Sequence, residues 1–90
     1  MRDQATRAVV ACTRLLRAHA VTTRAFNARL QATHGLTVND FEVLHRLSEA
    51  TDGLMRRIDL AQSVLLTPSG ITRLLDGLQR AGLVEKAECL

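Results

Sequence analysis

The longest regular pattern of apolar positions lies in the first third of the chain. Apolar or small residues recur there at alternating steps of three and four, which predicts a helix over about residues 5–34. The stripe consists of Ala5, Val9, Cys12, Leu16, Ala20, Thr23, Phe26 and Leu30. Such a helix is about 45 Å long, whereas a compact domain of this size is only about 30 Å across. We therefore predict a dimerisation helix that buries Val9, Cys12 and Leu16 against a second chain.

Two shorter helices are predicted in the middle of the chain. Thr37 is placed to cap a helix over residues 37–50, which ends at the Thr51-Asp52-Gly53 turn. Its apolar positions are Phe41, Val43, Leu44 and Leu47. Residues 54–56 are too few to classify from periodicity, and a brief strand is one interpretation. A further helix is expected near residues 57–65, with Leu60, Ala61 and Val64 on its inner face.

The sharpest helix start of the chain lies at residues 67–68. Thr67 is predicted as the N-cap and Pro68 as the first helical residue, where the missing amide costs nothing and the fixed φ suits the helix. Gly82 is expected to end this helix in a left-handed conformation. Residues 83–86 then have the pattern of a first strand. The inner face of the helix carries Ile71, Leu74, Leu75 and Leu78 at positions i, i+3, i+4 and i+7.

Residues 57–82 together predict a helix-turn-helix, because two short helices are joined by about three residues. The face opposite the leucine stripe of the second helix combines hydroxyl and guanidinium groups, which contact bases and phosphates in DNA complexes. These outward residues are Ser69, Thr72, Arg73, Asp76 and Arg80. The alternative is an ordinary amphipathic surface helix in which Asp76 and Arg80 form an i,i+4 ion pair.

Composition and charge narrow the class of protein. The 90 residues allow one domain, and the net charge of +3 mildly favours an anionic partner. Residues 1–35 hold six arginines and one aspartate, whereas residues 36–90 are net acidic. Cys12 and Cys89 are too far apart to suggest a disulfide framework or a zinc site, so a cytoplasmic location is expected. No apolar run approaches the length of a membrane span or of a signal-peptide core.

The sequence does not predict catalysis or metal binding. It contains no Ser/His/Asp arrangement, no Gly-x-Ser-x-Gly motif and no phosphate-binding glycine loop. The three histidines, His19, His34 and His45, have no carboxylate or cysteine at ligand spacing. We therefore expect neither an enzyme nor a metal site.

The helix-turn-helix segment resembles the winged helix-turn-helix core of the multiple antibiotic resistance regulator (MarR) family. The resemblance rests on Leu60-Ala61, on the run from Thr67 to Asp76 and on Leu78-Gln79-Arg80-Ala81-Gly82-Leu83-Val84-Glu85-Lys86. It implies a mainly α fold with a long N-terminal dimerisation helix, a DNA-binding helix over residues 68–81 and the start of a wing over residues 83–90. It also implies a bacterial, dimeric regulator that binds double-stranded DNA.

The resemblance assigns roles to individual residues. It implies that Thr72 and Arg73 meet bases and phosphates, that Ser69 makes a contact at the helix start, and that Arg56 supplies a basic residue before the motif. Thr67 and Arg80 complete the expected DNA-binding set. Relatives also bind small aromatic or phenolic effectors, but no residue of this sequence identifies such a ligand. A redox role for Cys12 is the other alternative that the resemblance raises, although a core cysteine is the simpler interpretation.

The chain departs from the family pattern in two places. Gly77 stands where many relatives have a basic residue, which removes a phosphate contact and costs helix stability. The family pattern also continues past Leu90 through a wing hairpin and two C-terminal helices, so we expect the chain to be a piece of a longer regulator. The predicted function is repression of transcription by a dimer on operator DNA. The alternative is a truncated dimerisation or protein-interaction module with weak or no specific DNA binding.

Overall fold

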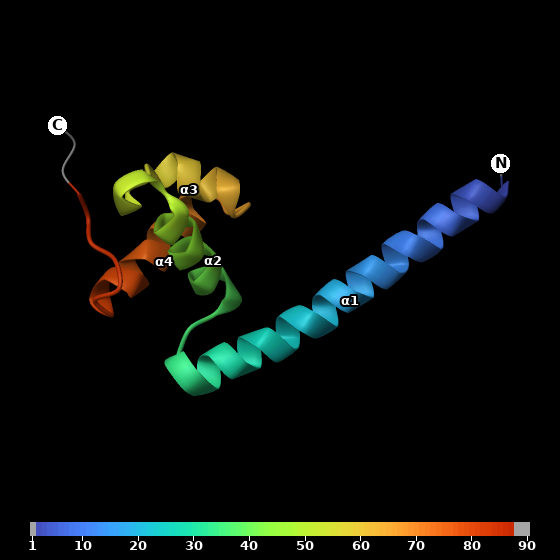
Figure 1. Ribbon diagram of the computed structural model, residues 1–90, viewed down its shortest axis with the longest axis horizontal. Helices are drawn as coiled ribbons and strands as arrows, with labels where there is room; N and C mark the ends of the chain where they lie inside the picture. Colours follow the sequence, from blue (N-terminus) through green and yellow to red (C-terminus); the bar gives the residue numbers. More distant parts are fainter. Residues whose placement is uncertain (1, 88–90) are drawn as a thin grey trace. The chain divides into compact units, whose positions relative to one another are not determined.

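The computed structural model describes residues 2–87, and these residues are mainly α-helical (Figure 1). This confirms the predicted mainly α character of the fold, and no strand occurs anywhere in residues 2–87. The chain divides into two compact units, Met1–Val38 and Asn39–Leu90, which are described separately below. In chain order the elements are α1 (Arg2–His34), α2 (Val38–Glu49), the 3₁₀ helix η1 (Thr51–Gly53), α3 (Arg57–Ser63) and α4 (Pro68–Arg80).

The first unit is a single unbroken helix and the turn that ends it. Helix α1 extends to His34 as predicted, but it begins at Arg2 rather than at about residue 5. Gly35 ends the helix with a φ of +67°, a conformation that glycine adopts without steric cost. The amide of Val38 then donates to Oδ1 of Asn27 at 3.1 Å, which ties the turn back to the helix.

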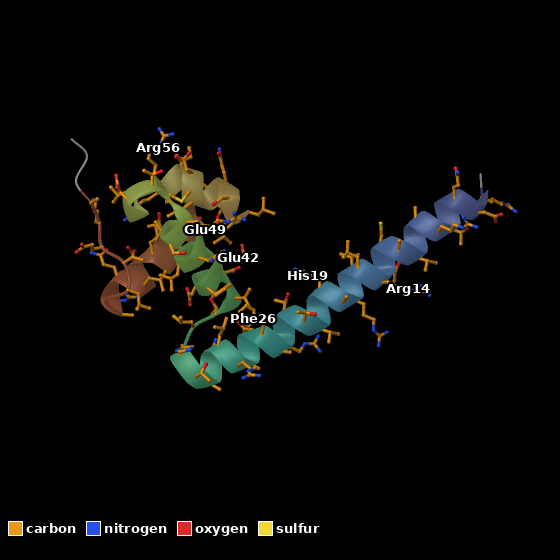
Figure 2. All side chains as sticks on the ribbon, viewed as in Figure 1. Arg14, His19, Phe26, Glu42, Glu49 and Arg56 are labelled. Carbon is orange, nitrogen blue, oxygen red and sulfur yellow. The ribbon has the colours of Figure 1, made fainter. Side chains whose placement is uncertain are left out.

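Helix α1 presents nearly all of its side chains to solvent. Figure 2 shows side chains such as Arg14 and His19 projecting from it, and every residue from 2 to 22 is exposed. Leu30 is the buried residue that the helix contributes within the described part of the chain. Most of the predicted apolar stripe is therefore exposed, and helix propensity alone stabilises such a helix only marginally.

The second unit forms the hydrophobic core around α3 and α4, which pack against each other. The predicted inward positions are confirmed for α3, and the apolar stripe of α4 is buried except at Leu74, which is half-buried. Phe41 of α2 departs from its predicted apolar face, because it is 38% exposed and stacks on the ring of His45. The buried side chains of this unit are Val43, Leu60, Ala61, Val64, Ile71, Leu75 and Leu78.

The strands that the sequence suggested at residues 54–56 and 83–86 do not form. Leu54 and Arg56 have extended backbone angles, but neither segment is paired with another strand in the described residues. Extended segments become strands only when a neighbour satisfies their amides and carbonyls. Cys89 and Leu90, at the end of the predicted wing over residues 83–90, lie outside the described residues.

Candidate nucleic-acid interface

The start of α4 is fixed by a side-chain cap. Thr67 has an extended backbone, and its Oγ1 accepts a hydrogen bond from the amide of Gly70 at 3.0 Å. The hydroxyl of Ser69 lies 3.3 Å from the same oxygen. With Pro68 in the first turn, the N-cap that the sequence predicted is confirmed.

Gly70, the third residue of α4, lies close to the side chain that caps the helix. A Cβ atom at this position would lie 3.1 Å from Oγ1 of Thr67, closer than most real Cβ contacts. The absence of a side chain at residue 70 therefore leaves room for the cap. In the sequence, this close contact was visible only as a glycine three residues after the predicted N-cap.

Helix α4 has a buried face and an exposed face, as its periodicity predicted. Ile71, Leu75 and Leu78 are buried in the core. The polar residues of the other face are Ser69, Thr72, Arg73, Asp76 and Arg80, and all five are exposed.

The exposed arginines of α4 are available for a partner. The ion pairs among the described residues join His45 to Glu49 and Arg56 to Asp59, and neither pair involves α4. The ion pair between Asp76 and Arg80, which belonged to the alternative interpretation of this helix, is therefore not formed. Arg73 and Arg80 consequently have no ion-pair partner within residues 2–87, and the fork of N–H donors of a guanidinium group suits phosphates and guanine edges.

The hydroxyl hydrogen of Thr72 is already engaged in a hydrogen bond within α4. Its Oγ1 donates to the carbonyl oxygen of Pro68 at 3.0 Å, one turn earlier in the helix. The oxygen keeps its acceptor capacity, and the side-chain methyl group remains exposed. Thr72 is therefore arranged to accept a hydrogen bond or to make an apolar contact rather than to donate.

Arg56 lies at the start of α3 and is engaged within its own segment. Its Nε is 2.9 Å from Oδ2 of Asp59, and its Nη2 is 3.5 Å from Oδ1 of the same carboxylate. The Arg56 side chain is nevertheless 81% exposed. Asp59 thus compensates part of the charge of Arg56, a role that the sequence analysis missed although the i,i+3 spacing of the two residues was visible.

The predicted dimerisation residues lie on the open surface of α1. Val9 is 65% exposed and Leu16 is 69% exposed, and Cys12 is an exposed free thiol. Within the described chain these three residues pack against no core.

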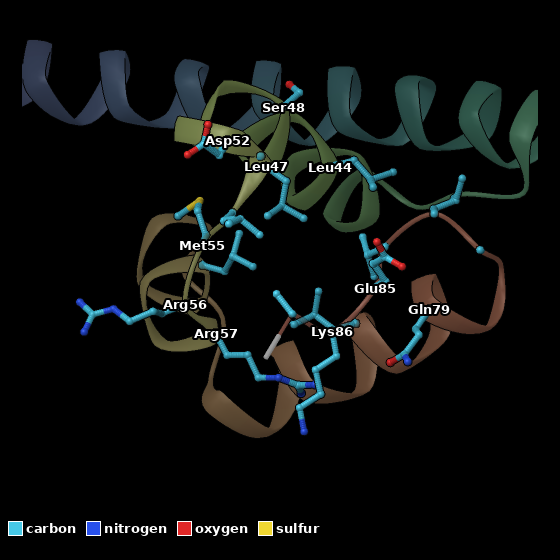
Figure 3. Close-up of a pocket in the computed structure, with 18 residues that line it drawn as sticks. Leu44, Leu47, Ser48, Asp52, Met55, Arg56, Arg57, Gln79, Glu85 and Lys86 are labelled. Carbon is cyan, nitrogen blue, oxygen red and sulfur yellow. The ribbon is translucent and has the colours of Figure 1, made fainter. Parts of the chain in front are cut away.

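A broad groove forms a second feature of the unit that contains α2, α3 and α4 (Figure 3). Leu44 and Leu47 of α2, Met55 and the segment from Gly82 to Ala87 contribute to its walls. Its volume of about 1530 Å³ exceeds the range of about 300–1,000 Å³ typical of small-molecule pockets.

The described residues contain no group of three or more His, Cys, Asp or Glu side chains that is arranged to hold a metal ion. None of the helices within residues 2–87 combines the length and the apolar character needed to cross a bilayer.

Comparison with known families places the helix-turn-helix in context. The sequence model of the MarR family matches residues 34–89, which is more than half of the chain and includes α2, α3 and α4. No curated protein and no solved structure matches the chain.

Proposed function

The chain belongs to the MarR family of DNA-binding transcription regulators, and we propose that it inserts α4 into the major groove of operator DNA. The observation that carries this proposal is the exposed face of α4, on which Arg73 and Arg80 have no ion-pair partner in the described part of the chain. The opposite face anchors the helix in the core. A helix held in this way presents its polar side chains at fixed positions.

Each residue of the proposed interface has its own role. Arg73 and Thr72 face base edges, and Arg80 contacts a phosphate further along the helix. At the start of α4, the hydroxyls of Thr67 and Ser69 and the backbone amide of Ser69 receive a phosphate, assisted by the helix dipole. The amides of Gly70 and Ile71 are already bonded to Thr67. Arg56 contributes a weaker phosphate contact, since Asp59 already engages its guanidinium group.

We propose that the protein acts as a homodimer through α1. The exposure of Val9, Cys12 and Leu16 along one helix supports this, because an apolar stripe is stabilised when a second copy covers it. Two copies then present two α4 helices to successive half-sites of a palindromic operator. The regulatory outcome we propose is repression, because a dimer bound across a promoter excludes the polymerase.

The exposed stripe of α1 also favours a second candidate function. In that alternative the chain pairs through α1 with another copy or with an intact regulator and binds DNA without sequence preference. Sedimentation of the chain with and without DNA separates the two functions, because only the regulator forms a complex that prefers the operator.

Fluorescence anisotropy tests the proposed function directly. The 90-residue chain is titrated into labelled DNA from upstream of its own gene and into a scrambled duplex, at two salt concentrations. We expect tighter binding to the upstream DNA and a loss of affinity at the higher salt, because phosphate contacts release counterions. Equal and weak binding to both duplexes would show that the alternative function is correct.

A further inference from the structure

The turn between α3 and α4 holds an apolar side chain in full solvent on a left-handed backbone. Leu65 has a φ of +57° and is 91% exposed, more than any other exposed large apolar residue of the described chain. A left-handed conformation brings the Cβ of an L-residue too close to its own backbone. Because the side chain is almost fully exposed, burial does not offset that strain.

The ends of α3 and α4 show that the turn itself does not require leucine. The amide of Leu66 donates to the carbonyl oxygen of Ala61 at 2.9 Å. In the same way, the amide of Leu83 donates to the carbonyl oxygen of Leu78 at 2.9 Å. Both are the same Schellman arrangement, in which the residue before the donor is left-handed. In α4 that residue is Gly82, with a φ of +78°, whereas in α3 it is Leu65. Glycine would therefore serve the turn at least as well as leucine.

The turn holds Leu65 at the same end of α4 as the proposed phosphate contact. Leu65 precedes the N-cap Thr67 by two residues, so their Cα atoms lie within about 7.6 Å of each other. Leu66, between them, is half-buried, and its amide is fixed by Ala61. The backbone of Leu65 is thus held between two helices rather than free to swing away.

We infer that Leu65 is a further DNA contact that packs its isobutyl group against a deoxyribose of the strand at the start of α4. This inference rests on the proposed function. Strain that no internal contact offsets points to a partner outside the chain. Leu65 has no hydrogen-bonding group and lies before α4 rather than on its groove-facing side, so the C–H surface of the sugar fits it better than a base edge or a phosphate.

The same anisotropy assay tests this contact with the variants Leu65→Ala and Leu65→Gly. We expect both to bind about tenfold more weakly, through the loss of buried apolar surface. The loss is equal for upstream and scrambled DNA because every nucleotide carries a deoxyribose. The salt dependence stays unchanged because no charge is removed. In thermal unfolding, Leu65→Gly raises Tm because it relieves the left-handed strain.

Leu83→Ala is the matched control, since Leu83 is an exposed leucine beside the left-handed residue at the other end of α4. It is expected to bind DNA as the unsubstituted chain does. Unchanged DNA affinity of both Leu65 variants overturns the inference, as does a loss confined to the upstream DNA, which would indicate a base contact. A lower Tm for Leu65→Gly overturns it as well, by showing a structural role. If the unsubstituted chain shows no preference for upstream DNA, the proposed function fails instead.

Discussion

At the scale of single residues, the candidate interface depends on which charged groups are already satisfied. Arg56 and Arg73 are both exposed arginines that belong to the predicted DNA-binding set. The structure distinguishes them, because Asp59 holds the guanidinium of Arg56 at 2.9 Å while Arg73 has no ion-pair partner among the described residues. Arg73 therefore has more to gain than Arg56 from a contact with DNA.

Replacing Arg73 is the sharpest test at this scale. We expect Arg73→Ala to weaken binding to upstream DNA by about 1–3 kcal/mol and to reduce the preference over scrambled DNA, because a base contact is lost. Anisotropy titrations with both duplexes measure the two effects. The control is Arg46→Ala, which removes the same charge from an exposed position on α2. Equal losses for the two variants would mean that Arg73 contributes only charge.

At the scale of elements, α4 has a well-capped N-terminus but a residue of low helix propensity in its interior. Thr67 and Pro68 define its first turn, but Gly77 interrupts its interior. A Cβ at Gly77 would meet nothing within 4 Å, and the same is true at Gly82 after the helix end. The two positions differ in backbone conformation, since only Gly82 has a positive φ, of +78°. The effect of a substitution at Gly77 or Gly82 is therefore decided by the backbone conformation of the residue and not by the space around it.

This contrast predicts opposite effects of the same substitution. Gly77→Ala is expected to raise the free energy of unfolding by about 1 kcal/mol, because alanine loses less backbone entropy than glycine in a helix. Gly82→Ala is expected to lower it by about 1 kcal/mol, because the left-handed conformation strains a residue with a Cβ. Urea unfolding followed by circular dichroism measures both. A change of the same sign in the two variants would contradict this account of the helix and its end.

At the scale of the whole molecule, the described chain leaves its longest helix uncovered. The second unit has a core of its own, whereas α1 exposes every residue from 2 to 22. Six arginines along α1 keep the helix hydrated, but they leave Val9 and Leu16 in water. This arrangement supports an assembly in which a second copy covers the stripe.

Substitutions on the two faces of α1 test that assembly. We expect Leu16→Glu to weaken self-association by at least about tenfold, because it places a charge where an apolar contact would be buried. Val21→Glu is the matched control, since Val21 is also exposed but lies about 140° around the helix from Leu16. Sedimentation velocity over a range of concentrations measures both. Equal effects of the two substitutions would show that the stripe is not the interface.

The sequence by itself determined the helices and the buried face of α4. The periodicity of Ile71, Leu75 and Leu78, the cap at Thr67 and the glycines at helix ends are local signals, and each is confirmed. The candidate DNA-contacting face was also predicted, because the residues opposite a buried stripe must lie on the surface. These features depend on spacings within one helix, which the chain fixes without reference to the rest of the fold.

Only the tertiary structure decided how neighbouring groups are used. It left the segments at 54–56 and 83–86 without partner strands, exposed Phe41 and engaged Arg56 with Asp59. It also placed Leu65 on a strained turn in full solvent, where the sequence showed only one more leucine in an apolar run. The physical reason is that strand pairing, exposure and ion pairing depend on which groups meet in space, and a one-dimensional pattern records periodicity but not neighbours.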